Sequence, residues 1–199
     1  MPDTTQKIHV FRHGATEWSV SGKHTGLTDV PLTDEGRRNA ERLRPLVQGC
    51  EFALVMSSPL QRALDTCRLA GLGDRAQVMD DLVEWDYGDY EGRTSEEIHR
   101  SDPDWLVFDD GCPNGESPAD VGQRVDRVIE RVRRAEGDVA LFAHGHVLRV
   151  LAARWLGLAP GGGRFFDLDT ATYNILGYYH ESPAVLRWNA PLAMGRQSG

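Results

Sequence analysis

Residues 9–18 of the chain read HVFRHGATEW, and this stretch decides how the fold is organised. The apolar run at residues 8–11 is typical of a short strand that is buried on both faces, as in a parallel sheet. Arg12, His13 and Gly14 follow it directly. Glycine lets the backbone turn sharply and approach a ligand closely. We therefore expect Arg12 and His13 at the carboxyl end of a buried strand, at the point where the chain turns.

Two other apolar runs have the same character, at residues 52–56 and 139–143. The second leads straight into His144, Gly145 and His146. In open sheets of parallel strands, ligands gather beyond the carboxyl ends of the strands. The sequence therefore predicts that His13 and His144 meet at one edge of a parallel sheet.

Helical patterns lie between these strands. In residues 58–71, Ser58 is placed to cap a helix that has Pro59 at its first position. Residues 33–47 are also predicted to be helical, with a kink or an early end at Pro45. Residues 117–135 place valines and an isoleucine on one face, and their arginines are interpreted as a solvated face. Strands alternating with helices predict a layered α/β domain.

The composition indicates the class of protein. A chain of 199 residues, 40% hydrophobic and 26% charged, describes a single domain over residues 1–199. The net charge of −8 disfavours nucleic acid and anionic membranes as partners. The cysteines, at positions 50, 67 and 112, are too few and too widely spaced for a disulfide framework or a zinc site. The first residues lack the apolar core of a signal peptide, and arginines interrupt the apolar residues 147–159, so we expect a cytoplasmic protein.

Arginine beside histidine at a sheet edge suits a phosphate group. Arg12 and Arg62, the latter in the opening turn of a predicted helix, would offer planar forks of donors to phosphoryl oxygens. The start of a helix adds backbone N–H donors. A neutral imidazole can attack phosphorus and form a phosphohistidine that water later cleaves. This chemistry requires no metal and no cofactor.

Two other interpretations of the histidines are open. A zinc or iron site would draw on His9, His13, His24, His144 and His146. The sequence has no His-x-x-x-His pair on a predicted helix and no carboxylate cluster at metal spacing, and arginines would repel a cation. Ordinary strand-to-helix turns explain either His-Gly pair alone. Both pairs together, with two arginines, favour a phosphate site.

Six blocks of sequence occur in a fixed order: FRHGATEW, HTGLTDVPLTDEG, SSPLQRALDT, EWDYGDYEG, NGES and AHGHVLR. Together they resemble the signature of the histidine phosphatase superfamily, in its phosphoglycerate mutase-like branch. The resemblance extends over about residues 8–149. It implies an α/β fold, a three-layer αβα sandwich around a mainly parallel sheet.

The resemblance also implies roles for individual residues. It makes His13 the phosphorylated nucleophile and Glu84 the proton donor. The residues around the phosphoryl group would be Arg12, Arg62 and His144. Further contacts to phosphate or substrate are implied for Ser19, Thr25 and Gly26, and for the backbone N–H of Gly145. The chain departs from the pattern at Ser19, where the mutases commonly have asparagine, and at Ala15, where Glu or Gln is usual.

Glu84 also has a physical basis as a proton donor. Aromatic neighbours, Trp85, Tyr87 and Tyr90, can exclude water from its carboxyl group and favour the protonated form. An exposed loop carboxylate is the simpler alternative, because other acidic residues share the stretch EWDYGDYEG.

The short chain is more similar to the phosphatases than to the mutases, which carry an insertion before the second histidine. Its blocks resemble a subgroup that includes sedoheptulose bisphosphatase and short acid phosphatases. We therefore expect hydrolysis of a small phosphorylated metabolite, a sugar phosphate or sugar bisphosphate. A cofactor-dependent phosphoglycerate mutase, a phosphoprotein phosphatase and a binding pseudoenzyme are the alternatives. Residues 105–114 are predicted to form a lid or to pack in the core, and a homodimer is compatible with the fold.

Overall fold

The computed structural model describes residues 5–192, which build a mixed sheet of six strands in the order β3-β2-β4-β1-β5-β6. The strands are β1 (Ile8–Arg12), β2 (Phe52–Ser57), β3 (Gln77–Val78), β4 (Asp138–Ala143), β5 (Tyr173–Tyr179) and β6 (Ser182–Ala190). β3, β2, β4 and β1 pair in parallel, whereas β5 is antiparallel to both β1 and β6. The sheet is therefore mainly parallel at its centre, with an antiparallel hairpin at one edge that the sequence analysis did not foresee.

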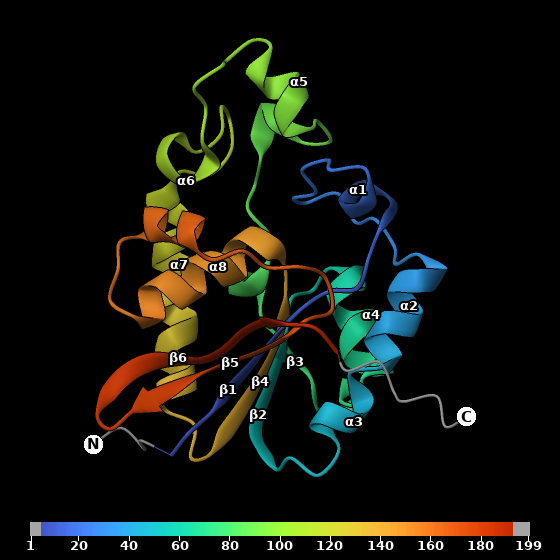
Figure 1. Ribbon diagram of the computed structural model, residues 1–199, viewed down its shortest axis with the longest axis vertical. Coiled ribbons are helices and arrows are strands. Elements are labelled where there is room, and N and C mark those ends of the chain that lie inside the picture. Colours follow the sequence, from blue (N-terminus) through green and yellow to red (C-terminus); the bar gives the residue numbers. More distant parts are fainter. Residues whose placement is uncertain (1–4, 193–199) are drawn as a thin grey trace.

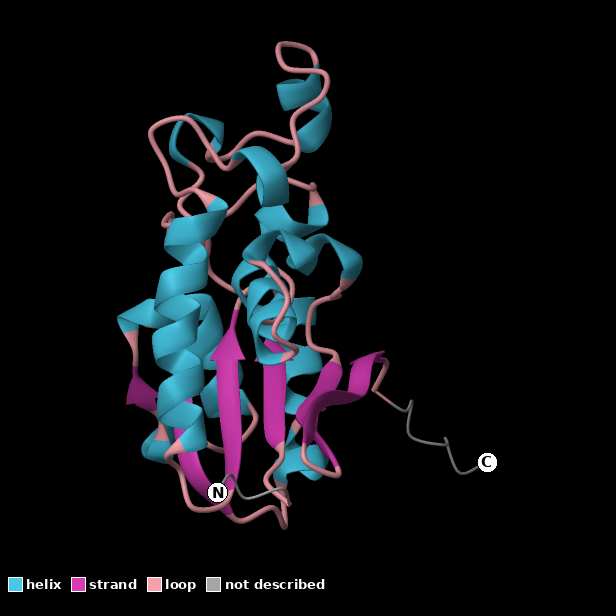
Figure 2. Cartoon of the chain, turned by 90° about the vertical axis from the view of Figure 1, so that its left-hand side faces the viewer, coloured by secondary structure: helices cyan, strands magenta, loops and turns pink. Residues whose placement is uncertain are grey.

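The parallel strands end together. Arg12 pairs with Ala143, and Ser57 pairs with Phe142, so the carboxyl ends of β1, β4 and β2 lie side by side. The loops and short helices gather beyond this edge, at the end to which the strands point (Figure 2).

Helices cover both faces of the sheet (Figure 1). One face carries α2 (Asp34–Glu41), α3 (Arg44–Val47) and α4 (Gln61–Leu69), and the other carries α7 (Pro118–Arg133) and α8 (Gly145–Trp155). Short helices stand beyond the strand ends: α1 (Glu17–Val20), α5 (Ser95–His99) and α6 (Val107–Asp110). Single 3₁₀ turns are η1 (Gly73–Arg75), η2 (Asp80–Leu82), η3 (Gly88–Tyr90) and η4 (Pro160–Phe165). The arrangement is a three-layer αβα sandwich.

Strand residues alternate between two hydrophobic cores. Ile8 and Val10 pack with the apolar residues of α7 and α8, whereas Phe11 packs with residues of α3 and α4. Both faces of the strand are buried, which explains why β1 is a continuous apolar run.

The helix boundaries correct two predictions. α4 begins at Gln61 with Leu60 as its N-cap, so Ser58 is not the cap; its hydroxyl contacts His144 instead. Residues 33–47 form two helices, and Pro45 lies in the first turn of the second, where its missing N–H costs nothing. Thr33 caps the first, and Ser117 caps α7 as part of a capping box.

The predicted solvated face of α7 is wrong for one arginine. Arg124 is only 6% exposed and turns inward with the valines of the helix. Across residues 5–192, no helix is both long and apolar enough to cross a membrane.

Candidate active site

Three neighbouring strands deliver polar side chains to one edge. His13 follows β1, His144 follows β4 and Ser58 follows β2. The N–H of His13 donates to the Ala143 carbonyl (3.0 Å), so the pairing of β1 and β4 continues into the site. The rings of His13 and His144 have centroids 5.2 Å apart. The predicted meeting of the two histidines is confirmed.

His13 has a defined tautomer. Its Nδ1 lies 2.7 Å from the carbonyl oxygen of Gly14, and a carbonyl only accepts, so Nδ1 carries the hydrogen. Burial lowers the pKa of His13 well below its usual value, and the charges of Arg12 and Arg62 lower it further. The ring is therefore neutral at pH 7, with a lone pair on Nε2. His13 lines the cavity described below, where that lone pair can act as a nucleophile.

Arg12 lines the same cavity, and one of its guanidinium donors is unused. Its Nη1 donates to the carbonyl of Leu168 (2.5 Å), which fixes the guanidinium. Its Nε is buried and has no hydrogen-bond partner within residues 5–192. A buried donor without a partner costs about 1–3 kcal/mol, unless a ligand completes it. Arg12 is thus arranged to bind an anion beside His13.

His144 lies one layer behind the cavity wall. Its Nδ1 accepts a hydrogen bond from Nε of Arg62 (3.0 Å), so its hydrogen is on Nε2, which donates to the hydroxyl of Ser58 (2.7 Å). Burial lowers the pKa of His144 well below its usual value, with Arg62 as the next cause. His144 is therefore a neutral donor at the floor of the site.

Arg62 does not lie where the sequence analysis expected a direct phosphate clamp. It is fully buried, and it is absent from the cavity wall. Besides its bond to His144, its guanidinium donates to the carbonyls of Thr28 (2.9 Å), Thr25 (3.1 Å) and Gly26 (2.7 Å). The loop that carries these carbonyls forms no strand or helix that could supply donors to them. The carbonyls are therefore hydrogen-bonded by the guanidinium of Arg62 instead. Arg62 ties the loop to His144.

Glu84 lines the same cavity, and its carboxyl group lies at the start of α8. Its carboxylate accepts the N–H groups of Trp85 (2.9 Å), His146 (3.0 Å) and Val147 (2.9 Å), the last two from the first turn of α8. These three backbone donors fix the position of the carboxyl group at the start of α8, and its role as a proton donor stays a prediction. The indole of Trp85 turns away and donates to the carbonyl of Glu116 (2.9 Å).

A cavity of about 160 Å³ joins these groups. Its wall includes Arg12, His13, Ser19, Thr25, Glu84 and Gly145. A methyl group added to Gly145 would lie 3.3 Å from Nε and Cζ of Arg12, so only glycine leaves the guanidinium its full space. The hydroxyl of Ser19 is less available to bind a ligand, because it already forms hydrogen bonds with the backbone of Thr16.

Gly26 does not line this cavity. Its N–H donates to the carboxylate of Glu91 (2.9 Å), and its carbonyl accepts from Arg62. A Cβ at this position would come within 2.6 Å of the Trp85 carbonyl. The residue is a point of close packing behind the wall and not a substrate contact.

A second chamber of about 270 Å³ adjoins the first and shares His24, His146 and Arg149 with it. Trp105, Leu106, Val107 and Phe108 form its apolar side. Within residues 105–114, residues 105–108 form a wall of this chamber, and Trp105, Val107, Phe108 and Cys112 pack in the core. Trp105 is 4% exposed, and its indole donates to the carbonyl of Gly111 (2.7 Å).

Tyr87 was predicted only as an aromatic neighbour of Glu84, and His146 only as a possible metal ligand. Burial raises the pKa of Tyr87 well above its usual value, so its hydroxyl keeps its hydrogen, and this hydroxyl is hydrogen-bonded to Nδ1 of His146. The pKa of His146 is lowered well below its usual value, mainly by burial. His146 lines both chambers and lies at their junction. The signal was present in HGHVLR, where His146 begins a helix beside His144.

Arg149, the last residue of the block AHGHVLR, was also given no functional role from the sequence. Its guanidinium donates only to the carbonyls of Gly163 (3.2 Å) and Arg164 (3.3 Å) and lies over the ring of Phe108 (4.5 Å). It makes no ion pair within the described residues. Both chambers therefore share a cation that no carboxylate of the described residues binds directly.

Comparison with known proteins finds relatives that belong to one family. A family model described as the histidine phosphatase superfamily (branch 1) matches residues 8–191. An acid phosphatase of Mycobacterium tuberculosis is 43% identical over 178 residues, 87% of each chain. A sedoheptulose 1,7-bisphosphatase of Saccharomyces cerevisiae is 39% identical, over 79% of this chain and 70% of its own. A solved structure of an open reading frame product from M. tuberculosis superposes with a TM-score of 0.88 at 40% identity, covering 93% of this chain and 97% of that one.

Proposed function

The chain belongs to the histidine phosphatase superfamily (branch 1), whose members here are hydrolases of phosphate monoesters, and we propose that it cleaves a small sugar phosphate or sugar bisphosphate through a phosphohistidine on His13. The proposal is carried by two residues that line one cavity: His13, with a free lone pair on Nε2, and Arg12, whose guanidinium has an Nε–H without a partner in the described residues. A nucleophile and an anion donor at the same place suit attack on a phosphoryl group.

The proposed reaction has two steps. Nε2 of His13 bonds to phosphorus while the P–O bond to the leaving group breaks, and the Glu84 carboxyl gives its proton to the departing oxygen. Water then attacks the phosphohistidine, with Glu84 taking the proton of that water. Three backbone N–H groups hold the Glu84 carboxyl in place for both proton transfers.

Neighbouring groups then hold the phosphoryl oxygens. Arg12 and the backbone N–H at Gly145 are proposed to contact them directly, since both line the cavity. Thr25 and Ser19 also line the cavity and are proposed to contact the phosphate or the rest of the substrate. His144 supports the floor, and Arg62 keeps its ring in place.

The shape of the site supports a small substrate. Two adjoining chambers of about 160 and 270 Å³ suit a phosphate and a leaving group the size of a sugar. A phosphoprotein would need an open, shallow cleft. The unpaired charge of Arg149 between the chambers supports a leaving group that carries a second anion, and one relative is named a sedoheptulose 1,7-bisphosphatase. The free thiols of Cys50, Cys67 and Cys112 support the expectation of a cytoplasmic enzyme.

A metabolite panel tests the proposal. Purified protein is assayed for phosphate release from sugar monophosphates, sugar bisphosphates and phosphopeptides, with phosphoglycerate mutase activity measured in parallel. We expect the highest kcat/KM for a sugar phosphate or bisphosphate. Rapid quenching with labelled substrate should trap an acid-labile, alkali-stable phosphoenzyme that His13→Ala lacks, and a chelator should leave the rate unchanged. Preference for phosphopeptides, or normal turnover by His13→Ala, would overturn the proposal.

A further inference from the structure

Glu84 is carried by a stretch of chain that has little regular structure. It lies between the single turns η2 (Asp80–Leu82) and η3 (Gly88–Tyr90), and no strand or helix covers residues 83–87. The carbonyl groups of such a segment need donors from elsewhere, because a buried backbone group without a partner is costly. The path of this segment therefore depends on side chains that bind its backbone.

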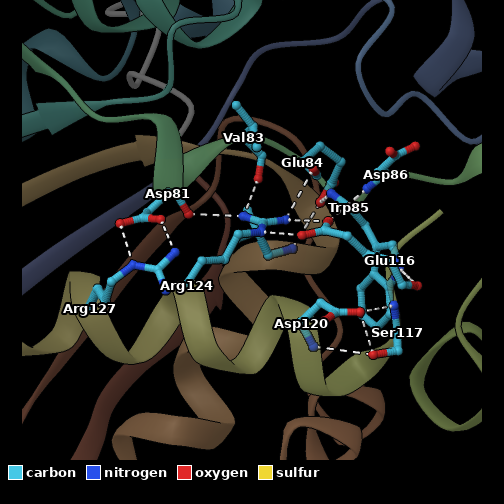
Figure 3. Close-up of polar contacts among 11 residues, drawn as sticks. Asp81, Val83, Glu84, Trp85, Asp86, Glu116, Ser117, Asp120, Arg124 and Arg127 are labelled. Atoms are coloured by element: carbon cyan, nitrogen blue, oxygen red, sulfur yellow. Dashed lines mark hydrogen bonds and ion pairs between the residues drawn. The ribbon is translucent and has the colours of Figure 1, made fainter.

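Arg124 of α7 supplies those donors. Its Nη1 donates to the carbonyls of Asp81 (2.9 Å) and Val83 (2.7 Å), and its Nη2 donates to the carbonyl of Glu84 itself (3.2 Å). One guanidinium thus holds three carbonyls of the segment that leads to the carboxylate (Figure 3).

Glu116 completes the arrangement from the other side. Its carboxylate binds Arg124 through two bonds, to Nε (2.7 Å) and Nη2 (2.9 Å), and it also accepts the N–H of Asp86 (2.9 Å). Its carbonyl accepts the indole N–H of Trp85 (2.9 Å). We call this pair the Arg124–Glu116 brace. It fixes the chain immediately before and immediately after Glu84 (Figure 3).

Stability alone is a poor explanation for the brace. Arg124 is 6% exposed, and moving an ion pair out of water costs about as much as the attraction returns. Apolar residues of similar size often stabilise such a position as well or better. An apolar pair, however, could not bind three carbonyls and an N–H, so it could not define the path of residues 81–86.

We propose that Arg124 and Glu116 are positioning residues for proton transfer, holding the Glu84 carboxyl at the distance needed to protonate the leaving oxygen. The inference rests on the proposed role of Glu84. A displacement of about 1 Å in such a group costs on the order of 10²-fold in rate. Loss of the brace therefore acts on the leaving-group proton and not on the attack by His13, which follows β1.

Two aryl phosphates that differ only in a para nitro group separate these effects. Phenyl phosphate and p-nitrophenyl phosphate present the same ring and phosphate, but phenolate is the more basic leaving group and needs the proton more. The single-turnover rate of phosphoenzyme formation is measured for both. In Arg124→Lys, one ammonium cannot replace a fork that binds Glu116 and three carbonyls. We expect the rate with phenyl phosphate to fall at least about 10-fold more than the rate with p-nitrophenyl phosphate.

The chain offers a matched control. Arg154 of α8 binds Asp126 of α7 through two bonds of 2.8 and 2.9 Å, the same kind of pair, and has no contact with residues 81–86. Arg154→Lys should leave the ratio of the two rates unchanged. Glu116→Gln, which keeps size and shape, gives an independent test if Arg124→Lys does not fold, and it should shift the ratio in the same direction.

The outcomes distinguish the two proposals. If Glu84→Gln and the brace variants all shift the ratio of the rates with the two substrates, both the acid role of Glu84 and the positioning role of the brace are supported. A ratio shifted by Glu84→Gln alone overturns the brace and leaves the acid role intact. An unchanged ratio in Glu84→Gln overturns the acid role, and an equal loss with both substrates in Arg124→Lys means that the brace serves folding only.

Discussion

Nε of Arg62 donates to Nδ1 of His144 across 3.0 Å, and this one bond decides that His144 carries its hydrogen on Nε2. The guanidinium is fully buried, and carbonyls of the loop at residues 25–28 hold its other nitrogens. The orientation of a ring at the floor of the site is therefore set by a residue that does not line the cavity.

Replacing Arg62 by lysine should abolish this arrangement, because an ammonium group cannot bond to His144 and to the loop carbonyls together. We expect kcat/KM to fall by about 10²-fold, roughly 3 kcal/mol of transition-state stabilisation. Arg68→Lys is the control, since Arg68 lies on the same helix and forms an exposed pair with Asp65. Wild-type kinetics in Arg62→Lys would show that a positive charge alone is enough.

Glu84→Gln keeps the size of the side chain but removes its proton. Phosphoenzyme formation from a sugar phosphate should slow by about 10²–10⁴-fold, because an alkoxide is strongly basic, whereas p-nitrophenyl phosphate should be affected much less. Single-turnover rates are compared, since Glu84 also serves the water that attacks the phosphohistidine. An equal loss with both substrates would transfer the acid role to another carboxylate, Asp86 or Asp89.

Gly145→Ala tests the space around Arg12. The added methyl would sit 3.3 Å from the guanidinium and force it to shift by a few tenths of an ångström. We expect inhibition by inorganic phosphate or vanadate to weaken by about 10-fold. The melting temperature should not fall, because alanine favours the helical conformation over glycine by about 1 kcal/mol. Unchanged inhibition by phosphate or vanadate would show that Gly145 does not help to form the phosphate-binding site.

His24 makes the stability of the protein depend on pH. Burial, with a smaller effect of His99, lowers the pKa of His24 from 6.5 to about 4. Between these values the unfolded chain binds the proton more readily, so the contribution to stability is complete above pH 6.5 and is lost as the pH falls to about 4. The loss amounts to roughly 3 kcal/mol.

Denaturant unfolding of His24→Gln at several pH values measures this effect. The variant should lose less free energy of unfolding between pH 7 and pH 4 than the wild type does, by roughly 3 kcal/mol. His180→Asn, at the exposed turn between β5 and β6, is the matched control. Parallel curves for His24→Gln and the wild type would show that this histidine does not drive acid destabilisation.

Much of the fold follows from local pattern. Apolar runs that end in polar residues and glycine identified β1 and β4, and parallel pairing then required His13 and His144 to meet. The spacing of Val121, Val125 and Val128 could also have placed Arg124 inward, because it lies three residues after the first and four before the last. It was treated as solvated only because arginine usually is.

Other features depend on the path of loops, which no periodicity describes. The bonds of Arg62 are to backbone carbonyls of residues 25–28, and any sequence presents such carbonyls. Ser58 was placed as a helix cap from local preference, yet the neighbouring strand brings His144 within 2.7 Å of its hydroxyl. Tertiary contacts decided both cases.

β4 lies between β1 and β2, although about 80 residues separate it from the end of β2 along the chain. Until β4 is in place, β1 and β2 have no common neighbour, and His13 and Ser58 are not held at one edge. A chain emerging from the ribosome, N-terminus first, therefore carries its nucleophile early and remains without phosphatase activity until residues 138–143 have been made. The order of synthesis thus keeps the enzyme inactive until most of its sheet can form.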